Sequence, residues 1–214
     1  MRPFKRIFDE DGLPVSPARV LRAYSERCFP MADDRDGCIF WIRPSERAVI
    51  TWDLYRIPRA IRPLLKNSPF RFTSDRAFSQ VVEQCARRGE TWISHDIEGL
   101  YNELFQLGHA HSVEAWDEEG NLVGGLYGLS SGGSFSGESM FHRKDNASMM
   151  ALHLLVCHLQ SIGYRMLDCQ QSSPHIDRFG AVTVDDDEFA LMLATSPKPL
   201  PWKSRAFPDM GTSS

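Results

Sequence analysis

The chain has 214 residues, of which 42% are hydrophobic and 24% are charged, and its formal net charge is −4. This length allows one substantial core, and the composition is that of a globular protein rather than a disordered one. The net charge provides no overall attraction for nucleic acid, so such a partner would need a local basic patch. No apolar run reaches membrane-spanning length and none follows the basic start of the chain, so we expect a cytoplasmic protein without membrane contact.

Residues 1–69 are rich in proline, arginine and aromatic residues and show little periodicity, which indicates a small, irregular N-terminal module. Ser16 and Pro17 suit the N-cap and the first turn of a short helix. The expected elements of this part are a helix over 17–25 and strands over 39–42 and 48–52.

From residue 70 to residue 196 the pattern becomes regular. Apolar residues between 78 and 85 recur at helical spacing, and Thr73 or Ser74 is the expected cap of that helix. The expected elements, in chain order, are a strand at 70–72, a helix that runs from this cap to Gly89, a helix at 96–107, a hairpin of strands 111–116 and 122–129, an extended segment at 135–141, a helix at 146–161, strands at 165–169 and 181–184, and a helix at 187–194.

This order of elements predicts an α/β (α+β) fold, in which an acetyltransferase-like mixed sheet has flanking helices. The strands are expected to pair largely as a meander, without the strict alternation of a doubly wound fold. We assign the main domain to residues 70–196 and expect a loosely ordered, proline-containing tail over 197–214.

Two acids and an amide are the candidate reactive groups. Asp168 and Gln170 lie two residues apart at the end of an expected strand, where alternation would put both side chains on one face. Glu138 lies among glycine and serine residues shortly before the central helix. Together they indicate a polar site for an amine or an ester. Cys169 should point away from Asp168, so we do not expect it to be a nucleophile.

The five cysteines are scattered without a Cys-x-x-Cys pair, and the only close histidine pair is His109-x-His111. Neither pattern completes a metal shell. We therefore expect neither a metal nor a cofactor.

Six short segments occur in a specific order and spacing: Thr91–Ile93, Gly108–Glu114 with Trp116, Leu122–Gly128, Gly137–Phe141, Asn146–Ser148 and Asp168–Gln170. On these segments the chain is identified as a divergent member of the leucyl/phenylalanyl-tRNA–protein transferase family. This family moves Leu or Phe from aminoacyl-tRNA to the N-terminal Arg or Lys of a protein, which marks that protein for degradation by the N-degron route. The resemblance implies a small N-terminal domain followed by an acetyltransferase-like catalytic domain.

The resemblance also implies roles for the polar residues. Asp168 and Gln170 match the family's catalytic pair, and Glu138 matches its partner acid. In one mechanism the pair helps to deprotonate the incoming α-amine, which then attacks the aminoacyl ester. In the alternative, the carboxylates only bind the cationic acceptor residue, because a carboxylate of ordinary pKa is a weak base.

Further positions match the family's binding residues. The apolar aminoacyl pocket is expected to favour Leu, Phe or Met, although each of its residues would otherwise be assigned to the core. The matching pocket positions are Leu126, Phe135, Leu152, Leu155, Leu159 and Leu167. Tyr24, Trp92 and Tyr101 match positions near the aminoacyl-adenosine, and Ser173 stands where an Asn is common. The basic residues Arg56, Arg59, Arg62 and Lys66 are the expected contacts to the tRNA backbone.

Several positions depart from the family pattern. Met31 replaces an aromatic residue, Trp41–Ser45 replaces Trp-Trp-Ser-Pro-Asp, and His142 and Met149 replace a Ser and a Lys. The acidic run 185–188 replaces a basic residue. These departures leave open the donor, the acceptor and the strength of tRNA binding.

The alternatives are a paralogue with a changed donor or acceptor, or a non-catalytic binder of protein N-termini. An acyl-CoA acyltransferase is disfavoured, because no Arg/Gln-x-x-Gly-x-Gly/Ala loop precedes the helix at 146. A monomer is the default expectation.

Overall fold

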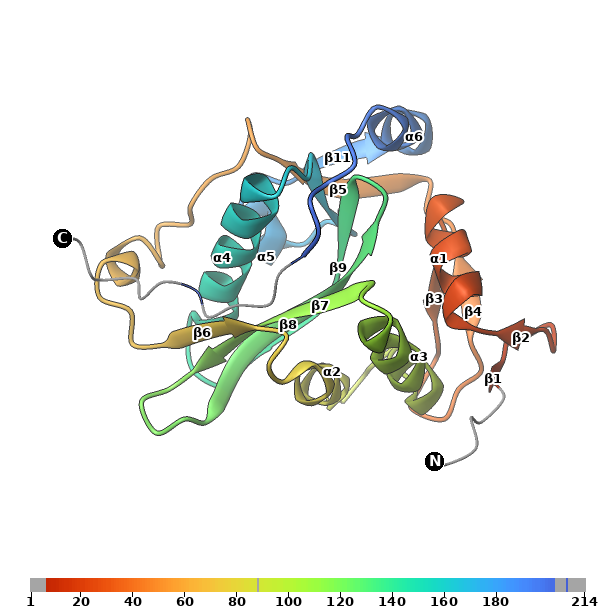
Figure 1. Ribbon diagram of the computed structural model, residues 1–214, viewed down its shortest axis with the longest axis horizontal. Coiled ribbons are helices and arrows are strands. Elements are labelled where there is room, and N and C mark those ends of the chain that lie inside the picture. Colours follow the sequence, from red (N-terminus) through yellow and green to blue (C-terminus); the bar gives the residue numbers. More distant parts are fainter. Residues whose placement is uncertain (1–6, 88, 203–206, 208–214) are drawn as a thin grey trace.

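The computed structural model describes residues 7–87, 89–202 and 207, and its centre is a seven-stranded sheet in the order β11-β5-β10-β9-β8-β7-β6 (Figure 1). Its strands are β5 (Glu46–Thr51), β6 (Arg71–Ser74), β7 (Ala110–Trp116), β8 (Leu122–Ser131), β9 (Ser134–His142), β10 (Met166–Gln170) and β11 (Val182–Asp185). All neighbouring strands are antiparallel except β9 and β10, which are parallel. A parallel pair requires a crossover, and the helix between these two strands provides it.

Helices cover both faces of the sheet. Helix α4 packs on one face, and α2 and α3 lie on the other (Figure 1). Because side chains alternate along a strand, β8 directs Leu126 into the core under α4 and Tyr127 into the core with α2 and α3. The helices are α1 (Pro17–Ser25), α2 (Phe78–Ala86), α3 (His95–Gln106), α4 (Ala147–Ser161), α5 (Pro174–Asp177) and α6 (Asp186–Ala194), with the 3-10 turn η1 (Pro63–Leu65).

The expected mixed α/β sheet with flanking helices is confirmed. Helix α1 has the predicted bounds, and the Ser16 side chain accepts a hydrogen bond from the backbone N–H of Arg19. The predicted cap of α2 is wrong, because Thr73 and Ser74 belong to β6 and pair with β7. Ala77 stands at the N-cap of α2 without a side-chain hydrogen bond. Thr73 and Ser74 therefore form part of the sheet, although their local preference is for the start of a helix.

The first part of the chain contributes directly to the main sheet. Strand β5 lies between β10 and β11, although it precedes the boundary expected at residue 69. Two small two-stranded sheets precede it, formed by β1 (Ile7–Phe8) with β2 (Pro14–Val15) and by β3 (Phe29–Met31) with β4 (Phe40–Ile42). The division into module, main domain and tail stays a prediction.

Part of the expected tail packs on the main domain. Trp202 stacks on His111 with ring centroids 4.2 Å apart, and the backbone N–H of Phe207 donates to Phe72 on β6. Residues 203–206 and 208–214 of that tail lie outside the described residues. Within the described part of the chain, none of the helices combines the length and the apolar character needed to span a bilayer.

Candidate active site

The end of β10 holds Asp168 and Gln170 in an unusual backbone geometry. Gln170 has φ 60, and the pairing of β10 with β5 shifts register between these two residues. Left-handed backbone is uncommon for glutamine and indicates a locally enforced conformation. The backbone N–H of Gln170 donates to Asp168 Oδ1 at 2.8 Å. This bulge interrupts simple alternation, so Asp168 and Gln170 border two different cavities.

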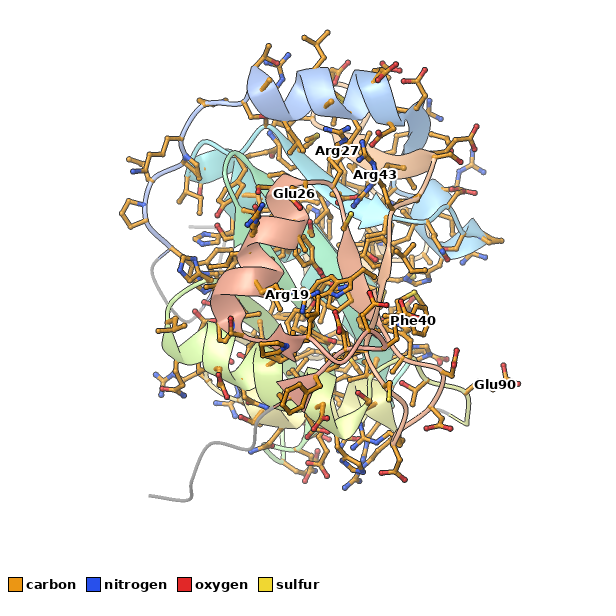
Figure 2. The ribbon with its side chains drawn as sticks, turned by 90° about the vertical axis from the view of Figure 1, so that its right-hand side faces the viewer. Arg19, Glu26, Arg27, Phe40, Arg43 and Glu90 are labelled. Atoms are coloured by element: carbon orange, nitrogen blue, oxygen red, sulfur yellow. The ribbon has the colours of Figure 1, made fainter. Side chains whose placement is uncertain are left out.

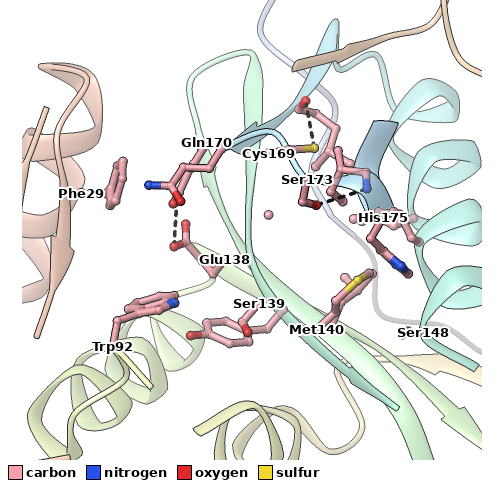
Figure 3. Close-up of a pocket in the computed structure, with 18 of the residues that line it drawn as sticks. Phe29, Trp92, Glu138, Ser139, Met140, Ser148, Cys169, Gln170, Ser173 and His175 are labelled. Carbon is pink, nitrogen blue, oxygen red and sulfur yellow. Dashed lines mark hydrogen bonds between the residues drawn. The ribbon is translucent and has the colours of Figure 1, made fainter. Parts of the chain in front are cut away.

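Glu138, on β9, connects Gln170 to two buried tyrosines. The Gln170 amide Nε2 donates to Glu138 Oε2 at 3.0 Å, as the dashed line in Figure 3 marks. The Tyr24 hydroxyl donates to Glu138 Oε1 at 2.6 Å and lies 2.6 Å from the Tyr101 hydroxyl. Burial raises the pKa of Glu138 to about 7 against the opposing effect of these hydrogen bonds. Glu138 is therefore the carboxyl group here that can change protonation near neutral pH.

Asp168 is paired with an arginine that sequence reasoning did not select. Arg47 and Asp168 are each 1% exposed, and Arg47 Nη1 donates to Asp168 Oδ2 at 2.6 Å. The Ser136 hydroxyl donates to the same oxygen at 3.1 Å. Burial raises the pKa of Asp168, and the positive charge of Arg47 is the largest opposing influence. The only sequence signal was an arginine directly before the apolar run of the expected strand at 48–52.

The first cavity adjoins Glu138 and Gln170 and has a volume of about 460 Å³. The greater part of its lining is apolar, and Met31 belongs to it. Phe29 and Trp92 line it as well (Figure 3). The expected pocket residues that line it are Leu126, Leu152, Leu155, Leu167, Trp92 and Ser173. Such a cavity suits an uncharged aliphatic or aromatic group, because a buried charge would be left uncompensated.

Four other expected binding residues do not line this cavity. Phe135 and Leu159 are fully buried in the core under α4, where Phe135 stacks with Trp202. Tyr24 and Tyr101 are buried, and their hydroxyls form the hydrogen-bond network around Glu138. The tyrosines thus support the acid, and Trp92 is the aromatic residue of the expected set that lines the cavity.

Several cavity residues were not selected from the sequence. His142 and His175 both line the first cavity, and His175 Nε2 has no hydrogen-bond partner within the described residues. Burial lowers the pKa of His175, with smaller contributions from the charges of Arg178 and His142. Cys169 also lines this cavity, and burial raises the pKa of its thiol. A protonated thiol is a poor nucleophile, in keeping with the expectation for Cys169.

The second cavity, of about 400 Å³, lies on the Asp168 side of the network. Asp168, Arg47, Ser136 and Tyr24 line it together with Phe189 of α6. Asp168 and Tyr24 each hydrogen-bond a residue of the first cavity, so a shared set of polar groups separates the two cavities.

The acidic run near α6 takes part in specific interactions. Asp185 caps α6 by accepting from the backbone N–H of Glu188. Asp186 forms ion pairs with Arg27 at 2.6 Å and Arg43 at 2.8 Å, which lie together beneath α6 (Figure 2). Hydrogen bonds from Arg27 and then Arg43 hold the pKa of Asp186 well below its usual range. Two of the four acidic side chains, Asp185 and Asp186, therefore already form interactions within the protein.

The expected basic patch lies away from both cavities. Arg56, Arg59, Arg62 and Lys66 are exposed on the segment that follows β5 and includes η1, and no ion pair joins them to an acid within the described residues. Among those same residues, no group of three or more His, Cys, Asp or Glu side chains is arranged to hold a metal ion.

Two family models match the chain. The model for the leucyl/phenylalanyl-tRNA protein transferase matches residues 49–194, and the model for the N-terminal domain of that transferase matches residues 14–45. The first match alone covers more than half of the chain and runs from within β5 to the end of α6. The class of protein is therefore an aminoacyltransferase.

Curated relatives agree with this class. The leucyl/phenylalanyl-tRNA–protein transferase of Rhizorhabdus wittichii is 44% identical over 184 residues, covering 84% of this chain and 74% of that protein. The enzyme of the same description from Salinibacter ruber is 45% identical over 179 residues, covering 84% and 79%. The chain belongs to the leucyl/phenylalanyl-tRNA–protein transferase family.

Solved structures resemble the chain more distantly. L-PGS from Bacillus licheniformis has a TM-score of 0.42 at 17% identity, covering 73% of this chain and 51% of that one. A GCN5-related N-acetyltransferase from Sphaerobacter thermophilus has a TM-score of 0.39 at 14% identity, covering 79% and 54%. Similarity at this level has no bearing on the substrate.

Proposed function

We propose that this protein transfers Leu or Phe from aminoacyl-tRNA to the N-terminal Arg or Lys of other proteins, which marks them for degradation by the N-degron route. Family membership supports the reaction class, and one observation supports the assignment of the site. A polar acid–amide pair, Glu138 and Gln170, adjoins a cavity that is otherwise largely apolar. The apolar part suits the side chain of the donor amino acid, and the pair suits the reacting amine and ester.

In the proposed reaction, the acceptor's α-amine attacks the carbonyl carbon of the aminoacyl ester. A C–N bond forms, the C–O bond to the ribose breaks, and the proton lost by the amine ends on the ribose hydroxyl. Gln170 donates through Nε2 to Glu138, which leaves its amide oxygen to accept a hydrogen bond from the amine. Positioning of this kind is expected to supply much of the rate enhancement.

Glu138 is the better candidate for the proton acceptor. Its pKa of about 7 suits a group that exchanges a proton at neutral pH. Asp168 instead accepts from three donors, namely Arg47, Ser136 and the backbone N–H of Gln170. Asp168 also lines the second cavity and not the first, so it is assigned to support Gln170.

Binding of the tRNA is assigned to the exposed basic residues Arg56, Arg59, Arg62 and Lys66. Trp92 lines the first cavity and is the candidate to stack on the terminal adenosine. Ser173 is a further binding candidate there, although its hydroxyl already accepts from the backbone N–H of Ile176. We further propose that the protein works in the cytoplasm as a monomer.

The direct test is transfer of radiolabelled Leu, Phe and Met from their tRNAs to model proteins that begin with Arg, Lys or Ala. We expect label on the Arg and Lys proteins and none on the Ala protein. Gln170→Ala should abolish transfer, whereas Gln160→Ala, on the exposed end of α4, should not change it. Folded protein that transfers none of the three donors but still binds Arg-initiated peptides would instead indicate a non-catalytic binder.

A further inference from the structure

We infer that Arg47 is a positioning residue of the transfer reaction, which holds Asp168 and, through it, the backbone of Gln170. The inference rests on the proposed function. Arg47 does not line the first cavity, where the acid–amide pair lies, so it acts through another residue rather than on the donor directly.

The guanidinium of Arg47 is fixed from several sides. Its Nη1 donates to Asp168, and its Nη2 donates to the backbone carbonyl of Arg27 at 2.5 Å. Its central carbon lies 5.3 Å from the ring centroid of Phe29 and 4.7 Å from that of Phe189. Arginine interacts favourably with aromatic faces at these distances. The cation is therefore presented to Asp168 in one orientation by β3, α6 and the segment that follows α1.

Asp168 transmits this orientation to Gln170. One carboxylate oxygen accepts from Arg47 and Ser136, which fixes the plane of the group, and the other accepts from the backbone N–H of Gln170. A glutamine with φ 60 needs such external support, because left-handed backbone is unfavourable for residues with a Cβ. In this conformation the side chain of Gln170 reaches Glu138 across the wall of the first cavity (Figure 3).

These hydrogen bonds thus form a continuous series from Arg47 to Asp168, Gln170 and Glu138. Loss of Arg47 would leave a buried carboxylate without its cation, which strongly favours protonation of Asp168. A protonated, rotatable carboxyl group would hold the Gln170 backbone less well. The expected defect is therefore in the chemical step rather than in donor binding.

The test compares Arg47→Met and Arg47→Lys with the matched control Arg43→Met, which removes an arginine that contacts Asp186 but not Asp168. We expect Arg47→Met to lower kcat at neutral pH by at least about tenfold, with KM for Leu-tRNA within about twofold of wild type. The kcat of Arg47→Met should rise with pH as Asp168 ionises, whereas the kcat of Arg43→Met should not show this rise. Arg47→Lys should be intermediate, because an ammonium can replace the charge but not the two-pronged geometry.

A second readout is independent of activity. The backbone and side-chain amide resonances of Gln170, in ¹⁵N-labelled protein, should shift or broaden in Arg47→Met and remain unchanged in Arg43→Met. If wild type transfers nothing, the proposed function has failed, and the resonances still test the role of Arg47.

An Arg47→Met protein that is folded and keeps its kcat, or that changes only KM, overturns the inference. Gln170 resonances that are unchanged in Arg47→Met also overturn it. If Arg47→Met does not fold, Arg47→Lys decides: a lowered kcat at constant KM supports the role, and an unchanged kcat overturns it.

Discussion

The buried carboxyl group of Glu138 should make the stability of this protein fall as pH rises from about 4.5 to about 7. Glu138 is 8% exposed, and its pKa is about 7 in the folded chain against an ordinary value of 4.5. Between these values the unfolded chain releases the proton while the folded chain retains it. Raising the pH through this interval therefore favours unfolding, and the effect is complete above pH 7.

The size of the effect follows from the two pKa values. Their difference corresponds to a loss of at most about 3 kcal/mol from the free energy of unfolding. Replacement of Glu138 by Gln removes the titrating group and keeps its shape. Its amide can accept from the Tyr24 hydroxyl and donate to the Gln170 side chain, so the hydrogen bonds can be replaced.

The assay is urea unfolding of wild type and Glu138→Gln at pH values from 4.5 to 8.5. Other groups titrate in both proteins, so the difference between the two free energies isolates Glu138. We expect that difference to change in favour of Glu138→Gln by up to about 3 kcal/mol across the interval. A difference that stays constant with pH would refute the reasoning, because Glu138 would then titrate alike in both states.

Three further predictions concern the substrates. Leu152→Phe should narrow the first cavity, which Leu152 lines. In competition assays kcat/KM should fall about tenfold or more further for Phe-tRNA than for Leu-tRNA. Equal losses for the two donors would contradict the assigned donor pocket. Changing Arg59, Arg62 and Lys66 to Gln should weaken the binding of all aminoacyl-tRNA donors alike. The slope of log K for tRNA binding against log salt concentration should fall in magnitude by about one for each phosphate that is no longer neutralised. An unaltered slope would show that these residues do not contact the tRNA. Met31→Trp should lower KM for the donor by adding a stacking surface at the first cavity, with Leu21→Trp outside it as the control; a KM unchanged by Met31→Trp would count against adenosine stacking there.

Much of the fold could be predicted because its elements carry local signals. The helix α1 has both a capping serine and a proline in its first turn, and the central helix α4 is a long apolar run ended by Gly163 with φ 88. The start of α2 could not be predicted, because the pairing of β6 with β7 depends on residues some forty positions away.

The candidate site depended on the family resemblance and on contacts that no local pattern contains. Arg47 and Asp168 lie 121 residues apart in the chain, so the alternation along either strand says nothing about their ion pair. Apolar periodicity likewise cannot separate Leu155, which lines the first cavity, from Leu159, which is core. In the sequence the acidic run left the strength of tRNA binding open, and nothing local showed that Asp186 forms ion pairs with Arg27 and Arg43 from the far end of the chain.

The position of β5 in the sheet has a consequence for biosynthesis. Its two neighbours, β10 and β11, are made last among the strands, so β5 leaves the ribosome more than a hundred residues before either of them. Its residues Ala48, Val49 and Ile50, which are buried in the finished protein, have no strand to pair with during that time. Non-local pairing of this kind is slow and leaves an apolar edge open. Arg47 meets Asp168 only at this final stage, so the nascent protein acquires its active site at the end of folding rather than during it.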